Sequence, residues 1–124
     1  MVDNEFFKKI AEIQKYVYEN IKEVVDCPTL ARKFNLNLRT FRDQFFIITG
    51  LTPKKYINEA RLNILVKILI KEKINKHRKL INYAHDIGLN SVASFCLLIK
   101  RETGKKAMEF IIHTKNKNKD NKRV

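Results

Sequence analysis

The chain has 124 residues, of which 26 are Lys or Arg and 13 are Asp or Glu, so its formal net charge at pH 7 is +13. This length allows one domain or two very small ones, and 44% hydrophobic residues are enough for a packed core, which excludes a chain disordered throughout. Three Gly and two Pro are too few for a turn-rich β-sandwich, and the lack of an apolar run of about 18 residues excludes a membrane-spanning helix.

The positive charge lies after the first predicted helix. Residues 1–26 contain six acidic and four basic side chains, a net charge of −2, so the remainder of the chain carries +15. A cationic surface at physiological salt attracts polyanions, nucleic acid first and anionic membranes second. Because the charge is uneven, we expect one surface beyond residue 26 to bind a polyanion.

Hydrophobic periodicity and capping residues predict an all-α fold of seven helices. The start of the chain shows the pattern, because apolar residues recur every three or four positions from Phe6 to Val24. All three Gly and both Pro fall at helix boundaries. The predicted helices cover residues 6–24, 27–34, 37–49, 53–72, 77–87, 90–103 and 105–112. Residues 113–124 have no apolar period, which predicts a disordered basic tail.

The cysteines and histidines do not indicate a metal or catalytic site. Cys27 and Cys96 have no second Cys or His at ligand spacing, and each lies in an apolar helical pattern typical of a buried hydrophobe. His77, His85 and His113 are scattered, which favours structural or solvated roles. We therefore expect no cofactor and no enzymatic activity.

Two segments share the pattern of a helix-turn-helix. In each, a small residue stands four positions before a turn residue, and a hydrophobe, a polar cap and two core residues follow the turn. A small residue lets the two helices approach closely, and the hydrophobe fixes the second helix to the core. The corresponding pairs are Ala31 and Ala84, Asn35 and Gly88, Leu36 and Leu89, Asn37 and Asn90 (with Ser91 as the alternative cap), Phe41 and Phe95, and Phe45 and Ile99.

These features resemble a known family. LARKFNLNLRTFRDQFFIITGLTPKKYINEARLNILVKILI is similar to the first half of the DNA-binding domain of AraC/XylS-type transcription regulators, and INYAHDIGLNSVASFCLLIKRETG to the second half. The resemblance covers about residues 16–110. It implies a DNA-binding domain over 1–112, with a first helix-turn-helix unit at about 5–50, a linker helix over 53–72 and a second unit at about 77–112. Its markers are Ala31, Phe45, Gly50, Pro53, Tyr56, Arg61, Leu62, Ala84, Gly88 and Gly104.

The first unit presents polar side chains suited to reading bases. With its core residues turned inward, the helix over 37–49 exposes Leu38, Arg39, Arg42 and Asp43 near its start. An arginine fork can donate to O6 and N7 of guanine together. The resemblance places Arg39, Arg42 and Asp43 at base contacts and Thr40 at a phosphate. Two alternatives remain open: the arginines form a solvated face, or Asp43 is their charge partner.

The second unit departs from this pattern. Its DNA-facing positions hold Val92, Ala93, Cys96 and Leu97, and the family commonly has an Arg where this chain has Leu97. Apolar side chains can contact a thymine methyl but supply no donor or acceptor. We expect base contacts at Val92 and Ala93 and mainly phosphate contacts elsewhere, so that the first unit gives most specificity and the second mostly affinity. The candidate phosphate contacts outside the first recognition helix are Lys54, Lys76, Arg78, Lys79, Ser91, Ser94, Lys100 and Arg101.

The sequence thus predicts a monomeric regulator that binds double-stranded promoter DNA through adjacent major grooves. The bacterial cytoplasm, at the nucleoid, is the expected location; RNA polymerase is a candidate partner, and no membrane partner is expected. Because the DNA-binding domain accounts for the chain, no effector-binding jelly roll is expected in it. The alternative is a degenerate helix-turn-helix module that binds another regulator or RNA polymerase, with weak non-specific DNA affinity and an apolar patch at Val92, Ala93 and Leu97.

Overall fold

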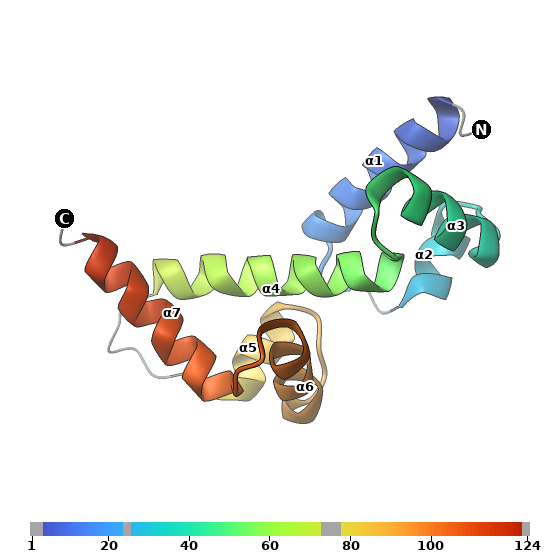
Figure 1. Ribbon diagram of the computed structural model, residues 1–124. Helices are drawn as coiled ribbons and strands as arrows, with labels where there is room; N and C mark the ends of the chain where they lie inside the picture. The colour runs from blue at the N-terminus through green and yellow to red at the C-terminus, as the bar shows by residue number, and fades with distance from the viewer. Residues whose placement is uncertain (1–3, 24–25, 73–77, 123–124) are drawn as a thin grey trace. The chain divides into compact units, whose positions relative to one another are not determined.

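The computed structural model describes residues 4–23, 26–72 and 78–122, with side chains described as far as residue 117. These residues form helices without any strand, which confirms the predicted all-α class. Within the same residues, every helix is too short or too polar to cross a membrane. The helices are α1 (Asn4–Glu19), α2 (Cys27–Lys33), α3 (Leu38–Thr49), α4 (Pro53–Lys71), α5 (Leu80–Asp86), α6 (Val92–Thr103) and α7 (Ala107–Lys122) (Figure 1).

The chain divides into two compact units whose boundary lies within α4. Unit 1 is Met1–Ala60 and contains α1, α2, α3 and the start of α4; unit 2 is Arg61–Val124 and contains the rest of α4 with α5, α6 and α7 (Figure 1). The charge is divided unequally. Unit 2 has 16 Lys and Arg against 5 Asp and Glu, whereas unit 1 has 10 against 8. The excess positive charge therefore belongs almost entirely to unit 2.

The core of unit 1 is an aromatic cluster built on α3. Phe41 and Phe45 are fully buried, and the ring of Tyr56, on the first turns of α4, lies edge-on to Phe45 with centroids 5.4 Å apart. Burial, with a smaller effect from Tyr18, raises the pKa of Tyr56 to about 12. The buried faces of α1 and α2 complete this core. The outward face of α3 is thereby held rigidly by the residues on its inward face.

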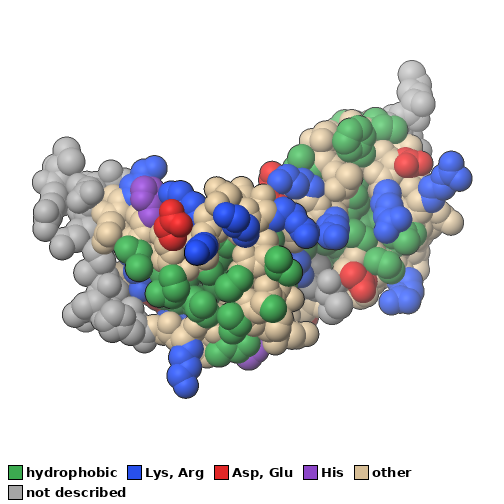
Figure 2. Space-filling model, turned by 60° about the horizontal axis from the view of Figure 1, so that its bottom comes forward, with side chains coloured by type: hydrophobic (Ala, Val, Ile, Leu, Met, Phe, Trp, Pro, Cys, Tyr) green, Lys and Arg blue, Asp and Glu red, His purple; other side chains and the backbone are tan. Residues whose placement is uncertain are grey.

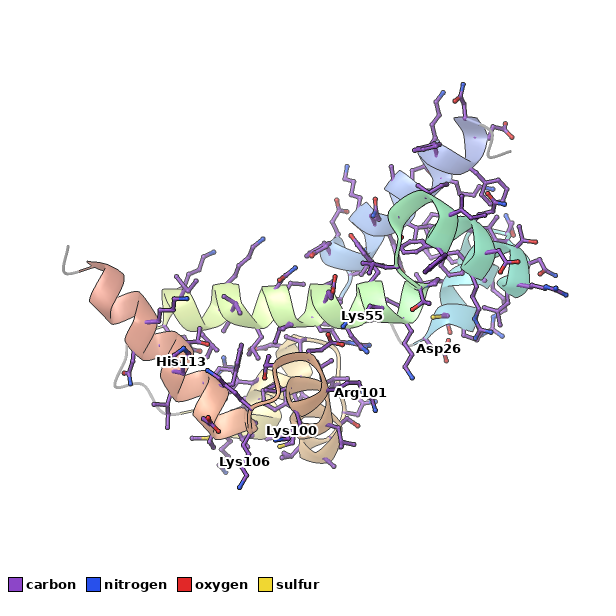
Figure 3. All side chains as sticks on the ribbon, viewed as in Figure 1. Asp26, Lys55, Lys100, Arg101, Lys106 and His113 are labelled. Carbon is purple, nitrogen blue, oxygen red and sulfur yellow. The ribbon has the colours of Figure 1, made fainter. Side chains whose placement is uncertain are left out.

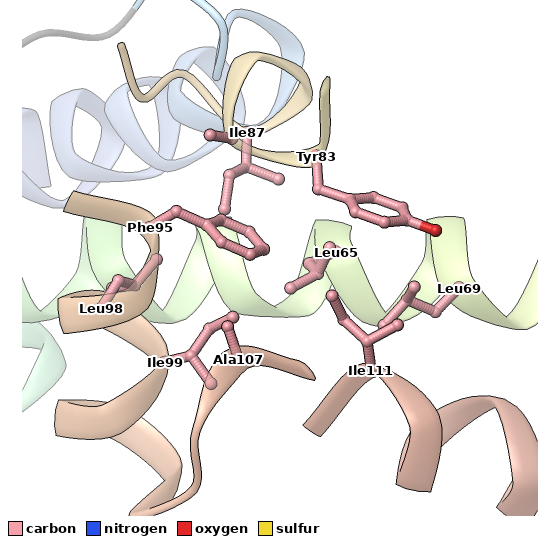
Figure 4. Packing of buried hydrophobic residues seen from close by; sticks show 10 residues of the cluster. Leu65, Leu69, Tyr83, Ile87, Phe95, Leu98, Ile99, Ala107 and Ile111 are labelled. Atoms are coloured by element: carbon pink, nitrogen blue, oxygen red, sulfur yellow. The ribbon is translucent and has the colours of Figure 1, made fainter. Parts of the chain in front are cut away.

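The core of unit 2 brings together side chains from four helices (Figure 4). Phe95 of α6 stacks on Tyr83 of α5, with ring centroids 6.5 Å apart. Arg61 of α4 is also buried, and its Nε donates to the carbonyl of Ile87 at 3.1 Å, which ties α4 to the end of α5. The aliphatic members of the cluster are Leu65, Leu69, Ala84, Ile87, Leu98, Ile99, Ala107 and Ile111.

A network of charged groups fixes α7 to the end of α4. Glu72 accepts hydrogen bonds from Arg78 (2.8 Å), Tyr83 (2.6 Å) and Lys115 (3.1 Å), and Arg78 also donates to Asp86 (2.6 Å). Burial alone would raise the pKa of Glu72, but the hydrogen bonds from Tyr83, Arg78 and Lys115 outweigh it and hold that pKa below its ordinary value. Burial would lower the pKa of Lys115, and its hydrogen bonds to Tyr83 and Glu72 raise it instead.

This network corrects the prediction of a disordered basic tail after residue 112. The described part of that segment continues α7 as far as Lys122. Lys115 is only 8% exposed and follows the buried Ile111 by one helical turn, so a lysine extends the buried face of the helix. A hydrophobic periodicity that treats every lysine as a solvent residue misses this position.

The end of the first predicted helix and the start of the fifth also differ from the structure, and α6 and α7 each begin two residues later than predicted. The first helix ends at Glu19, where the backbone N–H and the side-chain amide of Asn20 both donate to the carbonyl of Tyr16 (2.9 and 3.1 Å) and a tighter turn follows; Val24 lies outside the described residues. α5 begins at Leu80, after Lys79 in extended conformation, and the predicted start at His77 also lies outside them.

Candidate nucleic-acid interface

The two predicted helix-turn-helix turns have the same backbone geometry. In each, one residue has a positive φ, 55° at Asn35 and 86° at Gly88, which Asn and Gly adopt at lower cost than other residues. The next residue closes the turn by donating its N–H to the carbonyl of the buried alanine. These bonds are Leu36 to Ala31 (2.7 Å) and Leu89 to Ala84 (2.9 Å).

The second helices are also equivalent, but their starts are offset by one residue. Asn37 caps α3 by accepting from the N–H groups of Arg39 (3.0 Å) and Thr40 (3.3 Å). Of the two predicted caps of α6, Ser91 has this role, because it accepts from Ser94 N–H at 3.1 Å. The second turn is therefore one residue longer than the first, which corrects the pairing of Asn37 with Asn90.

Both second helices have 12 residues and end at a glycine with positive φ, Gly50 (79°) and Gly104 (77°). A constant shift of 54 residues therefore relates positions on α3 to positions on α6. By this shift the outward residues Arg39, Arg42 and Asp43 correspond to Ala93, Cys96 and Leu97.

The outward face of α3 is polar at its start and apolar near its end. Arg39, Arg42 and Asp43 are all exposed, on the side opposite the buried aromatic residues. One turn further on, Phe46 is 55% and Ile47 61% exposed. Sequence reasoning missed these two residues, although their spacing of three and four from the polar group would have placed them on the same face.

Other residues of α3 have more limited roles. Thr40 is exposed, and its phosphate contact stays a prediction, whereas Leu38 is half-buried and only partly available on the outward face where it was expected. Among the ion pairs of the described residues, none joins Asp43 to Arg39 or Arg42. The geometry therefore gives no support to Asp43 as an internal charge partner.

The outward face of α6 has the reverse arrangement, apolar at its start and basic at its end. Val92 and Ala93 are exposed, Leu97 is 63% exposed, and Cys96 is half-buried. Lys100 and Arg101 follow on the next turn and are exposed (Figure 3). Lys100 Nζ also donates to the carbonyl of Gly104 at 3.0 Å, which satisfies the end of the helix.

The structure sorts the remaining candidate phosphate contacts. Lys54, Lys79 and Ser94 are exposed, and Lys76 lies outside the described residues. Ser91 is half-buried and uses its hydroxyl as the cap, donating in turn to Ser94 Oγ at 3.0 Å. Lys106, which sequence reasoning did not include, is exposed just before α7 (Figure 3). Its place directly after the turn at 104–105 could have predicted this exposure.

Arg78 is not placed for a phosphate contact, which corrects its predicted role. Its two terminal nitrogens bind Glu72 and Asp86, and its guanidinium lies 4.5 Å from the ring centroid of Tyr83. Burial opposes the charge of Arg78, but its hydrogen bonds to Asp86 and Glu72 outweigh burial and raise its pKa. A basic run in sequence gives no sign of an acidic partner eight residues away.

A duplicated helix-turn-helix, with its second helices exposed and its excess charge positive, is typical of DNA-binding domains. The search against family models found no match. The chain is 26% identical over 92 residues to the virulence regulon transcriptional activator VirF of Yersinia enterocolitica and to the thermoregulatory protein LcrF of Yersinia pestis. It is 30% identical over 94 residues to the HTH-type transcriptional activator RhaS of Salmonella schwarzengrund.

These matches cover 74% to 76% of this chain but 32% of each relative, so the chain matches about a third of their length. VirF and RhaS are named as transcriptional activators, LcrF as a thermoregulatory protein, and none of the three as an enzyme. Their similarity confirms the predicted resemblance and supports an AraC/XylS-type DNA-binding domain in this chain.

Proposed function

We propose that this protein is a sequence-specific regulator that binds double-stranded promoter DNA with α3 and α6 in adjacent major grooves. The observation that carries the proposal is the repeated turn, in which the same backbone hydrogen bond precedes two exposed helices of equal length.

The length of α4 supports the use of successive grooves. Its 19 residues span about 28 Å at 1.5 Å per residue. Successive major grooves on one side of B-DNA recur at about 34 Å. A helix that contributes residues to both units is therefore of a suitable length to connect two readers of neighbouring grooves.

The base-reading groups of unit 1 are Arg39 and Arg42, with Asp43 as an acceptor for cytosine N4. A bidentate arginine–guanine contact contributes about 1–3 kcal/mol of discrimination, which is about 5- to 150-fold in affinity. The apolar start of α6 has no comparable donor. We therefore assign most sequence specificity to unit 1, and most phosphate affinity to unit 2, where the net charge is concentrated.

A selection of bound duplexes from random DNA, made at two salt concentrations, tests this function. The expected product is a bipartite site spanning about two helical turns. A site of half that length would show that one unit reads DNA alone. Recovery of no enriched sequence at either salt concentration would contradict a sequence-specific regulator.

Point variants then separate readers from phosphate contacts. Arg42→Ala should relax the sequence preference at one or two base pairs, whereas Arg101→Ala should weaken all duplexes alike and reduce the slope of log affinity against log salt by about one. Lys8→Ala is the matched control, since Lys8 is an exposed cation on α1. If Leu97→Ala relaxes specificity more than Arg42→Ala does, the assignment of specificity to unit 1 is wrong.

Transcription activation is the proposed outcome of DNA binding, because the VirF and RhaS relatives are named as activators. The partner would be RNA polymerase at the bacterial nucleoid, and Phe46 and Ile47 on α3 are exposed apolar residues of the kind that protein contacts use. Transcription in vitro from a promoter with the selected site tests this. Unchanged transcript levels on addition of the protein would contradict activation.

A further inference from the structure

The start of α6 presents an apolar surface that the fold does not use. Val92, Ala93 and Leu97 are exposed on one side of the helix, whereas Phe95 and Ile99 are fully buried on the other. An exposed leucine contributes little to stability. At the equivalent positions α3 has Arg39 for Ala93 and Asp43 for Leu97, so these exposed positions of α6 lack the hydrogen-bonding groups that α3 has.

The surroundings of this surface suit a polyanion. Lys100 and Arg101 are exposed on the following turn of α6, and Lys106 is exposed just before α7 (Figure 3). In the view of Figure 2, hydrophobic side chains gather on one part of the surface, with Lys and Arg side chains and an acidic side chain beside them. A rim of cations around an apolar centre complements a ligand with apolar groups between rows of phosphates.

The major groove of DNA has one apolar group among its base edges, the C5 methyl of thymine. Hydrocarbon side chains cannot form hydrogen bonds with the other groups on the base edges. We propose that α6 reads thymine methyl groups, with Leu97 as the principal contact and Val92 and Ala93 beside it. This inference rests on the proposed function and names the DNA that unit 2 prefers, a thymine-rich half-site.

The expected discrimination follows from the size of one methyl group. Burying one carbon of this kind corresponds to about a fourfold change in affinity. This is at or below the lower end of the range for a bidentate arginine–guanine contact. Methyl reading by α6 is therefore compatible with greater specificity in unit 1.

Deoxyuridine provides the direct probe, because it differs from thymidine only by the methyl group. Duplexes carrying the selected site are made with deoxyuridine in place of thymidine, in one half-site at a time, and their affinities are measured at one salt concentration. We expect about a fourfold loss per contacted methyl in one half-site. Replacing a contacted thymine–adenine pair by cytosine–guanine should weaken binding. A methyl group on C5 of that cytosine should restore part of the lost affinity.

Leu97→Ala assigns the effect to α6. This variant should bind two duplexes with nearly equal affinity when they differ only in having thymidine or deoxyuridine at the position that Leu97 contacts. Met108→Ala is the matched control, because Met108 is an exposed apolar residue of unit 2 on α7 (52% exposed) and should keep the wild-type ratio. The ratio of two affinities is insensitive to a general loss of stability, so a partly destabilised variant remains informative.

The possible failures are distinguishable. Sequence-specific binding without any deoxyuridine effect would overturn methyl reading and leave the proposed function standing. An unchanged ratio in Leu97→Ala would overturn the proposal that Leu97 is the principal methyl contact. If that variant retained the ratio but lost binding to RNA polymerase, the apolar surface would be a protein-docking site. The absence of any preferred duplex would overturn the proposed function itself.

Discussion

Lys115 offers a direct test of how α7 is held in unit 2. We expect Lys115→Met to lower the free energy of unfolding by about 2 kcal/mol, the range for a hydrogen bond between charged groups being about 1.5–3 kcal/mol. Methionine keeps an unbranched apolar side chain that reaches as far as Cε, and it lacks the ammonium group. The expected loss therefore measures the interaction with Glu72.

The remaining contacts of Glu72 set the upper limit of the effect. Removing one partner of a fully buried ion pair costs about 3–5 kcal/mol, because the other charge is left unpaired. Here Arg78 and Tyr83 stay within 2.8 and 2.6 Å of the Glu72 carboxylate. The carboxylate is not left unpaired, so the cost should remain below that range.

Urea unfolding followed by circular dichroism gives the free energy, and hydrogen exchange of the amides of 107–117 locates the change. Lys117→Met is the matched control, since Lys117 is an exposed lysine on the same helix. In a double-mutant cycle with Glu72→Gln, the coupling should be about 1 kcal/mol or more. Equal effects of the two lysine substitutions, with unchanged exchange in α7, would refute the role of the charged network.

The network and the helix ends give two further predictions. Folding lowers the pKa of Glu72, so its contribution to the free energy of unfolding is complete above pH 4.5, the ordinary pKa, and is lost as the pH falls through the pKa of the folded state. The urea concentration at the midpoint of unfolding should therefore be lower in acid, and this decrease should be smaller in Glu72→Gln. A midpoint equally acid-sensitive in that variant would contradict this. Gly50→Ala should cost about 1 kcal/mol in urea unfolding, from the positive φ alone, because a Cβ there would meet no atom within 4 Å; an unchanged midpoint would show that the turn relaxes freely.

Much of the fold was predictable because its signals are local. Asn37 and Gly50 mark the ends of α3 through hydrogen bonds and φ values within one turn, and the apolar period identifies the buried faces. The contacts of Lys115 were not predictable in this way. Its partner Glu72 is 43 positions away, and the chemistry that buries a lysine appears only when both helices are placed.

The candidate site was predictable to a similar extent. The exposure of Arg39 and Arg42 follows from helical periodicity, whereas the internal pairing of Arg78 depends on Asp86 in the following helix. The cap of α6 was ambiguous because Asn90 and Ser91 are both good capping residues. Backbone geometry, and not residue preference, selects between them.

The extra residue in the second turn determines how the proposed specificity can be redesigned. A transplant of the reading surface proposed on α3 must use the shift of 54, placing Ala93→Arg and Cys96→Arg in unit 2, whereas a shift of 53 would rotate the grafted side chains by about 100° around the helix. A chain with the correctly aligned graft should select a tandem copy of the sequence that unit 1 prefers, and the misaligned graft should not.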